Sequence, residues 1–164
     1  MIELEKALTG DSAAAPPSHI LEAISPDLAH RTLDRAPHTI YAELWHITFW
    51  LEMTLDWIAA RPTPFPVEPA LGFPSEAQTA AETWEQLCAR FFAGIEQAAA
   101  ATRDAAYLDE IVRCPSRPEE PERRMSVRDQ LESLAAHNAY HFGRIVLLRQ
   151  LADAWPPASG GFSW

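Results

Sequence analysis

The hydrophobic positions between Pro37 and Pro62 repeat at the spacing of an α-helix. Apolar residues recur there every three or four positions, as they do on one face of a helix: Ile40, Leu44, Ile47, Leu51, Leu55 and Ile58. Thr39 stands where an N-cap is expected, and Arg61 stands directly before the proline that would end the helix. The pattern predicts one long helix within residues 38–61.

Two further proline-free segments carry the same helical pattern. Ser75 and Gln78 have the spacing of a capping box, and the helix they begin is expected to end near Thr102. Its large apolar residues again fall at steps of three and four: Trp84, Leu87, Phe91 and Ile95. Ser126 and Asp129 repeat the capping arrangement at the start of a third helix, over about 126–154. One broad stripe of that helix is expected to face inward: Val127, Leu131, Leu134, Asn138, His141, Ile145, Leu148 and Ala152.

The prolines mark the connections between these helices, because proline removes a backbone donor and clashes inside a helix. Residues 62–74 hold five prolines and a glycine and are expected to form a stiff loop. Residues 103–124 are expected to form a solvated loop with room for a short strand. The shorter windows 1–15 and 18–25 supply one broken helix. We therefore predict an all-α chain, an up-and-down four-helix bundle that forms a single domain over residues 1–164.

Length, composition and charge limit the class of protein and the partners that it can bind. The chain of 164 residues has the length of one core, and no stretch approaches the roughly 18 apolar residues of a membrane span. A net charge of −10 disfavours nucleic acid and anionic membrane surfaces as partners. Cys88 and Cys114 could form at most one disulfide, and the amino terminus has no secretory character. We expect a reduced, cytoplasmic protein.

Three histidines stand on the predicted helices with a spacing that suits a metal ion. His137 and His141 are four residues apart, which places both rings on one helix face. His46 lies in the middle of the first long helix, on a line with Glu43 and Trp50. Buried imidazoles need partners, and one divalent cation would satisfy all three. Three nitrogen ligands would leave a position open for water or substrate, as in catalytic sites.

The same spacing allows an arrangement without a metal. The imidazoles would then be satisfied by hydrogen bonds to nearby groups: a backbone carbonyl or Glu43 for His46, and Tyr140, Asn138 or water for the pair. From the spacing alone, both interpretations stand. The remaining histidines, His19, His30 and His38, are expected to be polar surface residues. Glycine-rich nucleotide motifs are absent, and Cys88 is expected to be a packing residue.

The segments ELWHITFW and AAHNAYHFGRIVLLRQ, together with the lead-in 8–50 and the tail WPPASGGFSW, resemble the DinB-like (damage-inducible) superfamily. Its members include thiol-dependent S-transferases and mycothiol-dependent maleylpyruvate isomerases. The resemblance implies a four-helix bundle, often a homodimer, with a three-histidine site for nickel or zinc. His46, His137 and His141 match its first, second and third ligands. A basic pocket for a thiol is not recognisable in the sequence, which leaves the co-substrate open.

Two functions follow as hypotheses. In the first, the metal site activates a low-molecular-weight thiol or water for attack on a small electrophilic substrate. Trp50 and Trp57 would line the pocket above the metal, and Asn138, Tyr140 or Glu43 would orient the substrate or carry a proton. In the second, the protein is a non-catalytic, stress-related module that binds a metal or ligand or acts through a dimer interface. An open cavity over the metal favours the first function, and a site plugged by a tryptophan favours the second.

Overall fold

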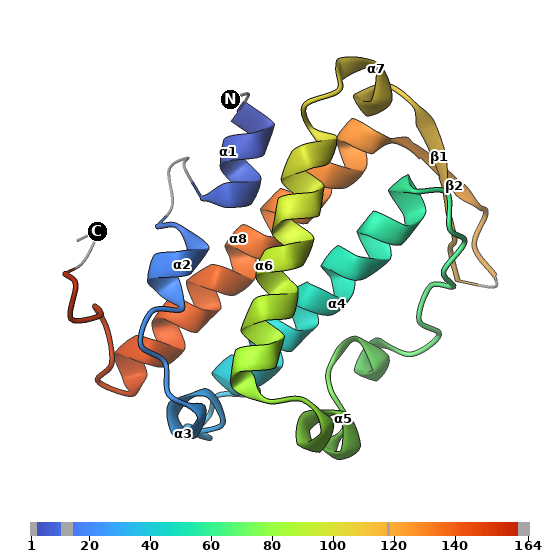
Figure 1. Ribbon diagram of the computed structural model, residues 1–164. Helices are drawn as coiled ribbons and strands as arrows, with labels where there is room; N and C mark the ends of the chain where they lie inside the picture. The colour runs from blue at the N-terminus through green and yellow to red at the C-terminus, as the bar shows by residue number, and fades with distance from the viewer. Residues whose placement is uncertain (1–2, 11–14, 118, 161–164) are drawn as a thin grey trace.

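Three long helices form the centre of the molecule (Figure 1). They are α4 (Ile40–Ile58), α6 (Trp84–Ala101) and α8 (Val127–Leu151), and α4 packs against both of the others. The computed structural model describes residues 3–10, 15–117 and 119–160. Its other elements are short: α1 (Glu3–Thr9), α2 (Pro17–Ile20), α3 (Pro26–Ala29), the 3-10 helix η1 (Pro69–Gly72), α5 (Glu76–Ala81), α7 (Ala105–Leu108), β1 (Ile111–Cys114) and β2 (Arg123–Ser126).

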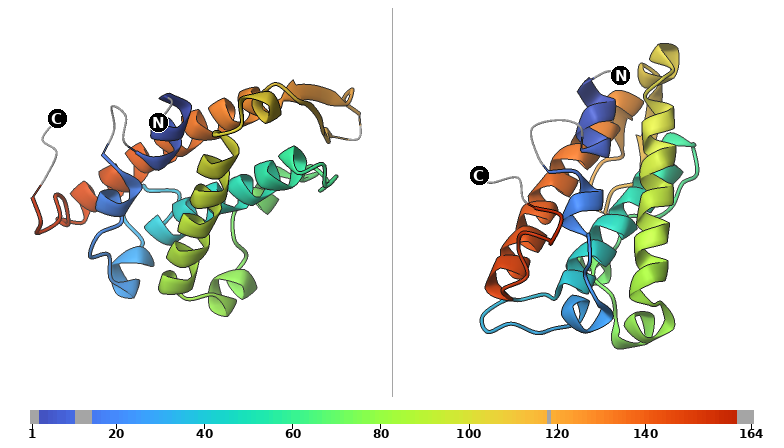
Figure 2. Two further views of the ribbon diagram at one scale, coloured as in Figure 1. Left: turned by 45° about the horizontal axis from the view of Figure 1, so that its top comes forward. Right: turned by 60° about the vertical axis from the view of Figure 1, so that its left-hand side comes forward.

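The chain is mostly helical, as the sequence predicts. The short helix α1 packs against α6 and α8, and α2 packs against α8, so the amino-terminal segment covers the long helices in separate pieces (Figure 2). Arg149, near the end of α8, links α2 to the segment that follows α8. Its buried guanidinium donates to the carbonyl oxygen of Ile20 at 2.5 Å and to that of Ala154 at 2.9 Å. Within the described residues, no helix has the length and apolar character needed to cross a bilayer.

The predicted helix over 75–102 is in fact two helices. Ser75 does form a capping box with Gln78, but it begins the six-residue helix α5. Thr83 forms a second capping box with Gln86 and starts α6, because Glu82 between the helices has an extended backbone. The end near Thr102 is confirmed by its position as the C-cap of α6. The other predicted caps, Thr39 and Ser126, both accept hydrogen bonds from the first turns of their helices.

Residues 103–124, expected to be a solvated loop with room for a short strand, contain the helical turn α7, the strand β1 and the start of β2. β1 and β2 pair antiparallel with Ile111 opposite Ser126 and Cys114 opposite Arg123. Because β2 leads directly into α8, the hairpin has a fixed position beside the start of that helix. Val112 and Cys114 are buried on one side of β1, which anchors the hairpin to the core.

Candidate metal centre

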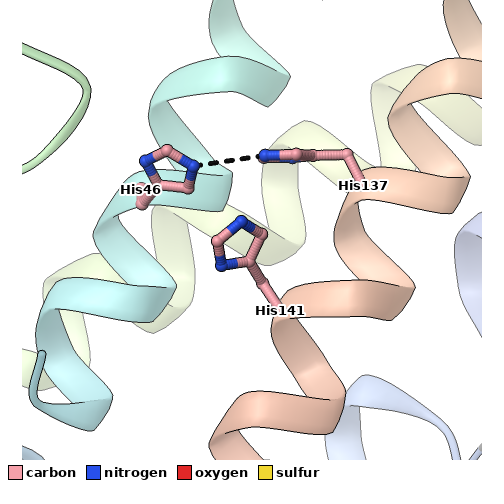
Figure 3. Close-up of side chains that lie close together, drawn as sticks. All are labelled: His46, His137 and His141. Atoms are coloured by element: carbon pink, nitrogen blue, oxygen red, sulfur yellow. Dashed lines mark hydrogen bonds between the residues drawn. The ribbon is translucent and has the colours of Figure 1, made fainter. Parts of the chain in front are cut away.

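Helices α4 and α8 bring three histidines together (Figure 3). His46 comes from α4, while His137 and His141 come from successive turns of α8, and the three rings converge between the helices. One nitrogen of each ring lies within 4.8 Å of those of the other two. The Nε2 atoms of His46 and His137 are 3.2 Å apart. The predicted convergence of the three imidazoles is therefore confirmed.

The backbone of the loop that follows α4 fixes the orientation of His46. Its Nδ1 lies 2.7 Å from the carbonyl oxygen of Gly72, at the end of η1. A carbonyl oxygen only accepts hydrogen bonds, so Nδ1 carries the proton and donates it. The lone pair of the neutral ring is then on Nε2, which faces the other histidines. The backbone carbonyl expected as an alternative to metal binding is present, but it contacts Nδ1 and leaves Nε2 directed at His137.

A buried carboxylate orients His141 in the same way. The Nδ1 atom of His141 donates to Oε2 of Glu43 at 2.6 Å, and Arg144 donates to Oε1 from Nε at 2.8 Å. The second nitrogen of Arg144 lies 2.7 Å from the same oxygen. Glu43 is 0% exposed. Burial raises the pKa of Glu43, but the hydrogen bonds from His141 and Arg144 lower it further, and the net pKa is below its usual range.

His137 has no second partner that would fix it. Its Nδ1 is buried, and it has no hydrogen-bond partner among the residues that the structure describes. Burial and the nearby rings of His141 and His46 lower the pKa of His137 to about 4. Burial also lowers the pKa of His46. His46 and His137 are therefore neutral at physiological pH, which is the form of imidazole that binds metal ions.

The donor set fits a divalent transition metal. Two nitrogen ligands at 2.0–2.1 Å in a tetrahedral site are about 3.3 Å apart, close to the spacing found between His46 and His137. In His46 and His141, a hydrogen bond at Nδ1 fixes the orientation of the ring and so directs Nε2 at the site. Imidazole nitrogens suit zinc, nickel, copper or iron. A fourth coordination position would remain open.

A cavity of about 390 Å³ lies against the histidines. Its wall includes the rings of His46 and His137 together with three aromatic side chains, Trp50, Trp57 and Phe65. The indole nitrogen of Trp57 donates to the carbonyl oxygen of Thr63 at 2.8 Å, which holds that ring in the wall. The tryptophans predicted to lie above the metal thus line the cavity and do not fill it.

Asn138 and Tyr140, also expected to contact substrate, are not among the residues that line this cavity. They follow His137 by one and three positions, which turns them to other sides of α8. Asn138 is 4% exposed and lies in the interior, whereas Tyr140 is 62% exposed. The ring of Tyr140 packs edge-on against that of His141, with 4.9 Å between centroids. Neither residue therefore belongs to the wall of this cavity.

Sequence reasoning missed the residues on the other side of His46. Phe73 stacks on the His46 ring with 4.3 Å between centroids, and His38 stacks on Phe73 at 3.9 Å. His38 is half-buried, so the expected surface position is wrong. Its burial lowers its pKa. Phe73 and Gly72 come from a proline-rich loop without periodicity, so no pattern in the sequence indicates their contacts.

The chain is similar to a known protein family. The model of the DinB superfamily matches residues 17–145, a range that includes His46, His137 and His141. A search of curated proteins finds no relative that matches the chain.

Proposed function

The chain belongs to the DinB superfamily, and we propose that it is a metal-dependent enzyme that activates a thiol or water for attack on a small electrophile. This family is the one that the histidine motifs indicate. His46, His137 and His141 would hold the metal, with zinc or nickel as the expected ion. A thiol S-transferase is the reaction that we favour, with a low-molecular-weight thiol as co-substrate.

The open cavity over the histidines carries this proposal. A purely structural metal site is closed by its ligands, whereas a catalytic site keeps a position that substrate can reach. Here two of the three histidines form part of the wall of a cavity of about 390 Å³. Such a volume lies within the range of small-molecule sites. Trp50 and Trp57 leave this space free, which favours catalysis over the non-catalytic module.

Hydrogen bonds from the chain's own residues fix the orientation of the histidine rings before a metal binds. A bound divalent ion would lower the pKa of a thiol or water, neither of which is sufficiently ionised at neutral pH. Glu43 holds the proton of His141 at Nδ1, and the Gly72 carbonyl does the same for His46. Arg144 keeps Glu43 ionised through two short contacts. These groups fix the rings before any ligand binds, which reduces the cost of ordering the site.

The cavity supplies polar groups that could orient a substrate. Thr54 and Ser133 bring hydroxyl groups to its wall, and Gln130 brings an amide. The Gln130 amide nitrogen lies 2.9 Å from Sγ of Cys114 and 2.9 Å from Sδ of Met125. These contacts hold the amide in one place at the edge of the cavity. Substrate orientation is therefore assigned to these groups and not to Asn138 or Tyr140.

Metal analysis combined with a transferase assay tests the proposal. We expect the purified protein to hold close to one equivalent of zinc or nickel, and His137→Ala to lose it. His30→Ala is the control, because His30 is exposed and lies outside the three-histidine group. Activity is measured as transfer of a low-molecular-weight thiol to 1-chloro-2,4-dinitrobenzene, with and without metal. Full metal retention by His137→Ala would refute the site, and a loaded protein without turnover would favour the non-catalytic module.

A further inference from the structure

We propose that the cavity selects organic anions with a flat apolar body, and that Arg123 binds the anionic group. This inference rests on the proposed function, because it names the class of substrate that the same site would accept. Arg123 lies at the start of β2 and lines the cavity that His46 and His137 also line. No sequence motif indicates this role, because the hairpin alone brings Arg123 to the cavity.

The charge around the cavity is opposite to that of the whole chain. The protein carries a net charge of −10, but among the described residues that line the cavity there is no aspartate or glutamate. Arg123 is the one permanently charged side chain among them. A cavity with this lining attracts an anion from solution.

Arg123 has no carboxylate partner among the residues that the structure describes. Arg113, on the other strand of the hairpin, forms an ion pair with Glu122 at 2.6 Å. In contrast, no described carboxylate lies within ion-pair distance of Arg123, whose guanidinium instead stands 5.8 Å from the centroid of the Phe65 ring. A guanidinium presents several donors in one plane and matches a carboxylate, sulfonate or phosphate. Arg123 is therefore free to bind an anionic ligand at the cavity.

Aromatic side chains determine the other part of the preferred ligand. Phe65 lies between the two tryptophans, with ring centroids 5.4 Å from Trp50 and 6.3 Å from Trp57. Leu134 adds an aliphatic surface to the same cavity. Such walls favour a flat ring system, which gains apolar contact and aromatic stacking there. A ligand with an aromatic body and one terminal negative charge matches both parts of the cavity.

The hairpin provides a matched control residue. Successive residues of a strand point to opposite faces, and Arg124 lines a different cavity, together with Arg61 and Glu110. Arg123 and Arg124 are both exposed. Replacing either by glutamine therefore removes the same charge from the same strand, and only the change at 123 alters the cavity beside the histidines.

Binding of a defined pair of probes tests the proposal. Isothermal titration calorimetry compares 2-naphthoate with its neutral counterpart 2-naphthylmethanol on the zinc-loaded protein and on chelator-treated protein. We expect 2-naphthoate to bind at least about ten-fold more tightly than the alcohol. Arg123→Gln is expected to weaken 2-naphthoate at least about five-fold in both forms, with the alcohol unchanged. Arg123→Lys should retain most of the affinity, and Arg124→Gln should stay within about two-fold of the parent.

The outcomes separate this inference from the proposed function. Equal effects of Arg123→Gln and Arg124→Gln would overturn it, as would equal affinity for both probes or no binding of 2-naphthoate. If binding depends on Arg123 but no metal is held or no turnover occurs, the anion site stands and the enzymatic proposal fails. The chelator-treated protein makes this distinction, because an anion that binds only to the metal would lose all affinity there.

Discussion

Replacing Glu43 by glutamine tests whether the buried carboxylate positions His141 for a metal ion. The wild-type carboxylate accepts from Nδ1 of His141 at 2.6 Å and from Nε of Arg144 at 2.8 Å, and it is fully buried. Glutamine has nearly the same shape but carries no charge. Its amide group also brings a donor to a place where two donors already point. One contact is lost, and the side chain of His141 is no longer fixed in one orientation.

The magnitude follows from the burial of the two partners. Removing one member of a buried ion pair costs about 3–5 kcal/mol when the other charge stays buried. The side chain of Arg144 is 32% exposed, so water can solvate it after the change. We therefore expect a smaller loss of about 2–3 kcal/mol in the free energy of unfolding. Loss of a carboxylate behind a ligating histidine typically weakens metal binding about 10–100-fold, and the same range is expected for zinc here.

Two measurements separate these effects. Competition with a fluorescent chelator gives the zinc affinity, and urea unfolding of the metal-free protein gives the stability. Glu82→Gln is the control variant, because Glu82 accepts two hydrogen bonds of 2.7 Å from Arg90 but does not touch the histidines. It should lose stability and keep its zinc affinity. If Glu43→Gln binds zinc as tightly as the parent protein, Glu43 does not position His141.

Acidification should destabilise the metal-free protein between pH 6.5 and 4, because His137 has a pKa of about 4 in the folded state and takes up its proton more readily when unfolded. Urea unfolding should show a loss of at most about 3 kcal/mol over this range, with a shallower pH dependence in His137→Gln; equal slopes would exclude His137 as the cause. Gly94→Ala should lower the free energy of unfolding by about 1–3 kcal/mol, since its Cβ would lie 2.6 Å from Cδ2 of Leu51. Gly143→Ala should raise the free energy of unfolding by about 0.5–1 kcal/mol, because a Cβ there meets no atom within 4 Å. Thermal unfolding measures both variants, and a change of the same sign in Gly94→Ala and Gly143→Ala would contradict this packing.

The sequence predicted the helices and the histidines because both depend on local periodicity. Thr39 and Ser126 cap their helices as expected, since a capping side chain needs only the backbone of its own first turn. The break between α5 and α6 at Glu82 also has a local signal, which is the capping box of Thr83 and Gln86. The alanine-rich sequence on both sides of the break made the segment resemble one continuous helix. Where two capping boxes follow one another within a periodic segment, a break between helices is the better prediction.

The contacts that the sequence could not predict come from segments without periodicity. Gly72 and Phe73 belong to the loop between α4 and α5, and their positions against His46 depend on the tertiary fold. Arg123 reaches the cavity only because the hairpin folds back beside α8. The spacing of His137 and His141 thus predicts that a metal can be held, whereas the orientation of the ligands and the selection of substrate depend on the loops.

The polar network around Glu43 also determines how α4 and α8 are aligned. His46 and His137 are separated by 91 residues, and their Nε2 atoms meet only if the two helices keep one register. Sliding one helix by a single turn would separate these atoms by about 5.4 Å, beyond the reach of one metal ion. Apolar packing tolerates such shifts better than a buried carboxylate does, because Glu43 would lose both His141 and Arg144 and remain charged in the interior. The interaction that orients His141 therefore also keeps the three histidines within reach of one another.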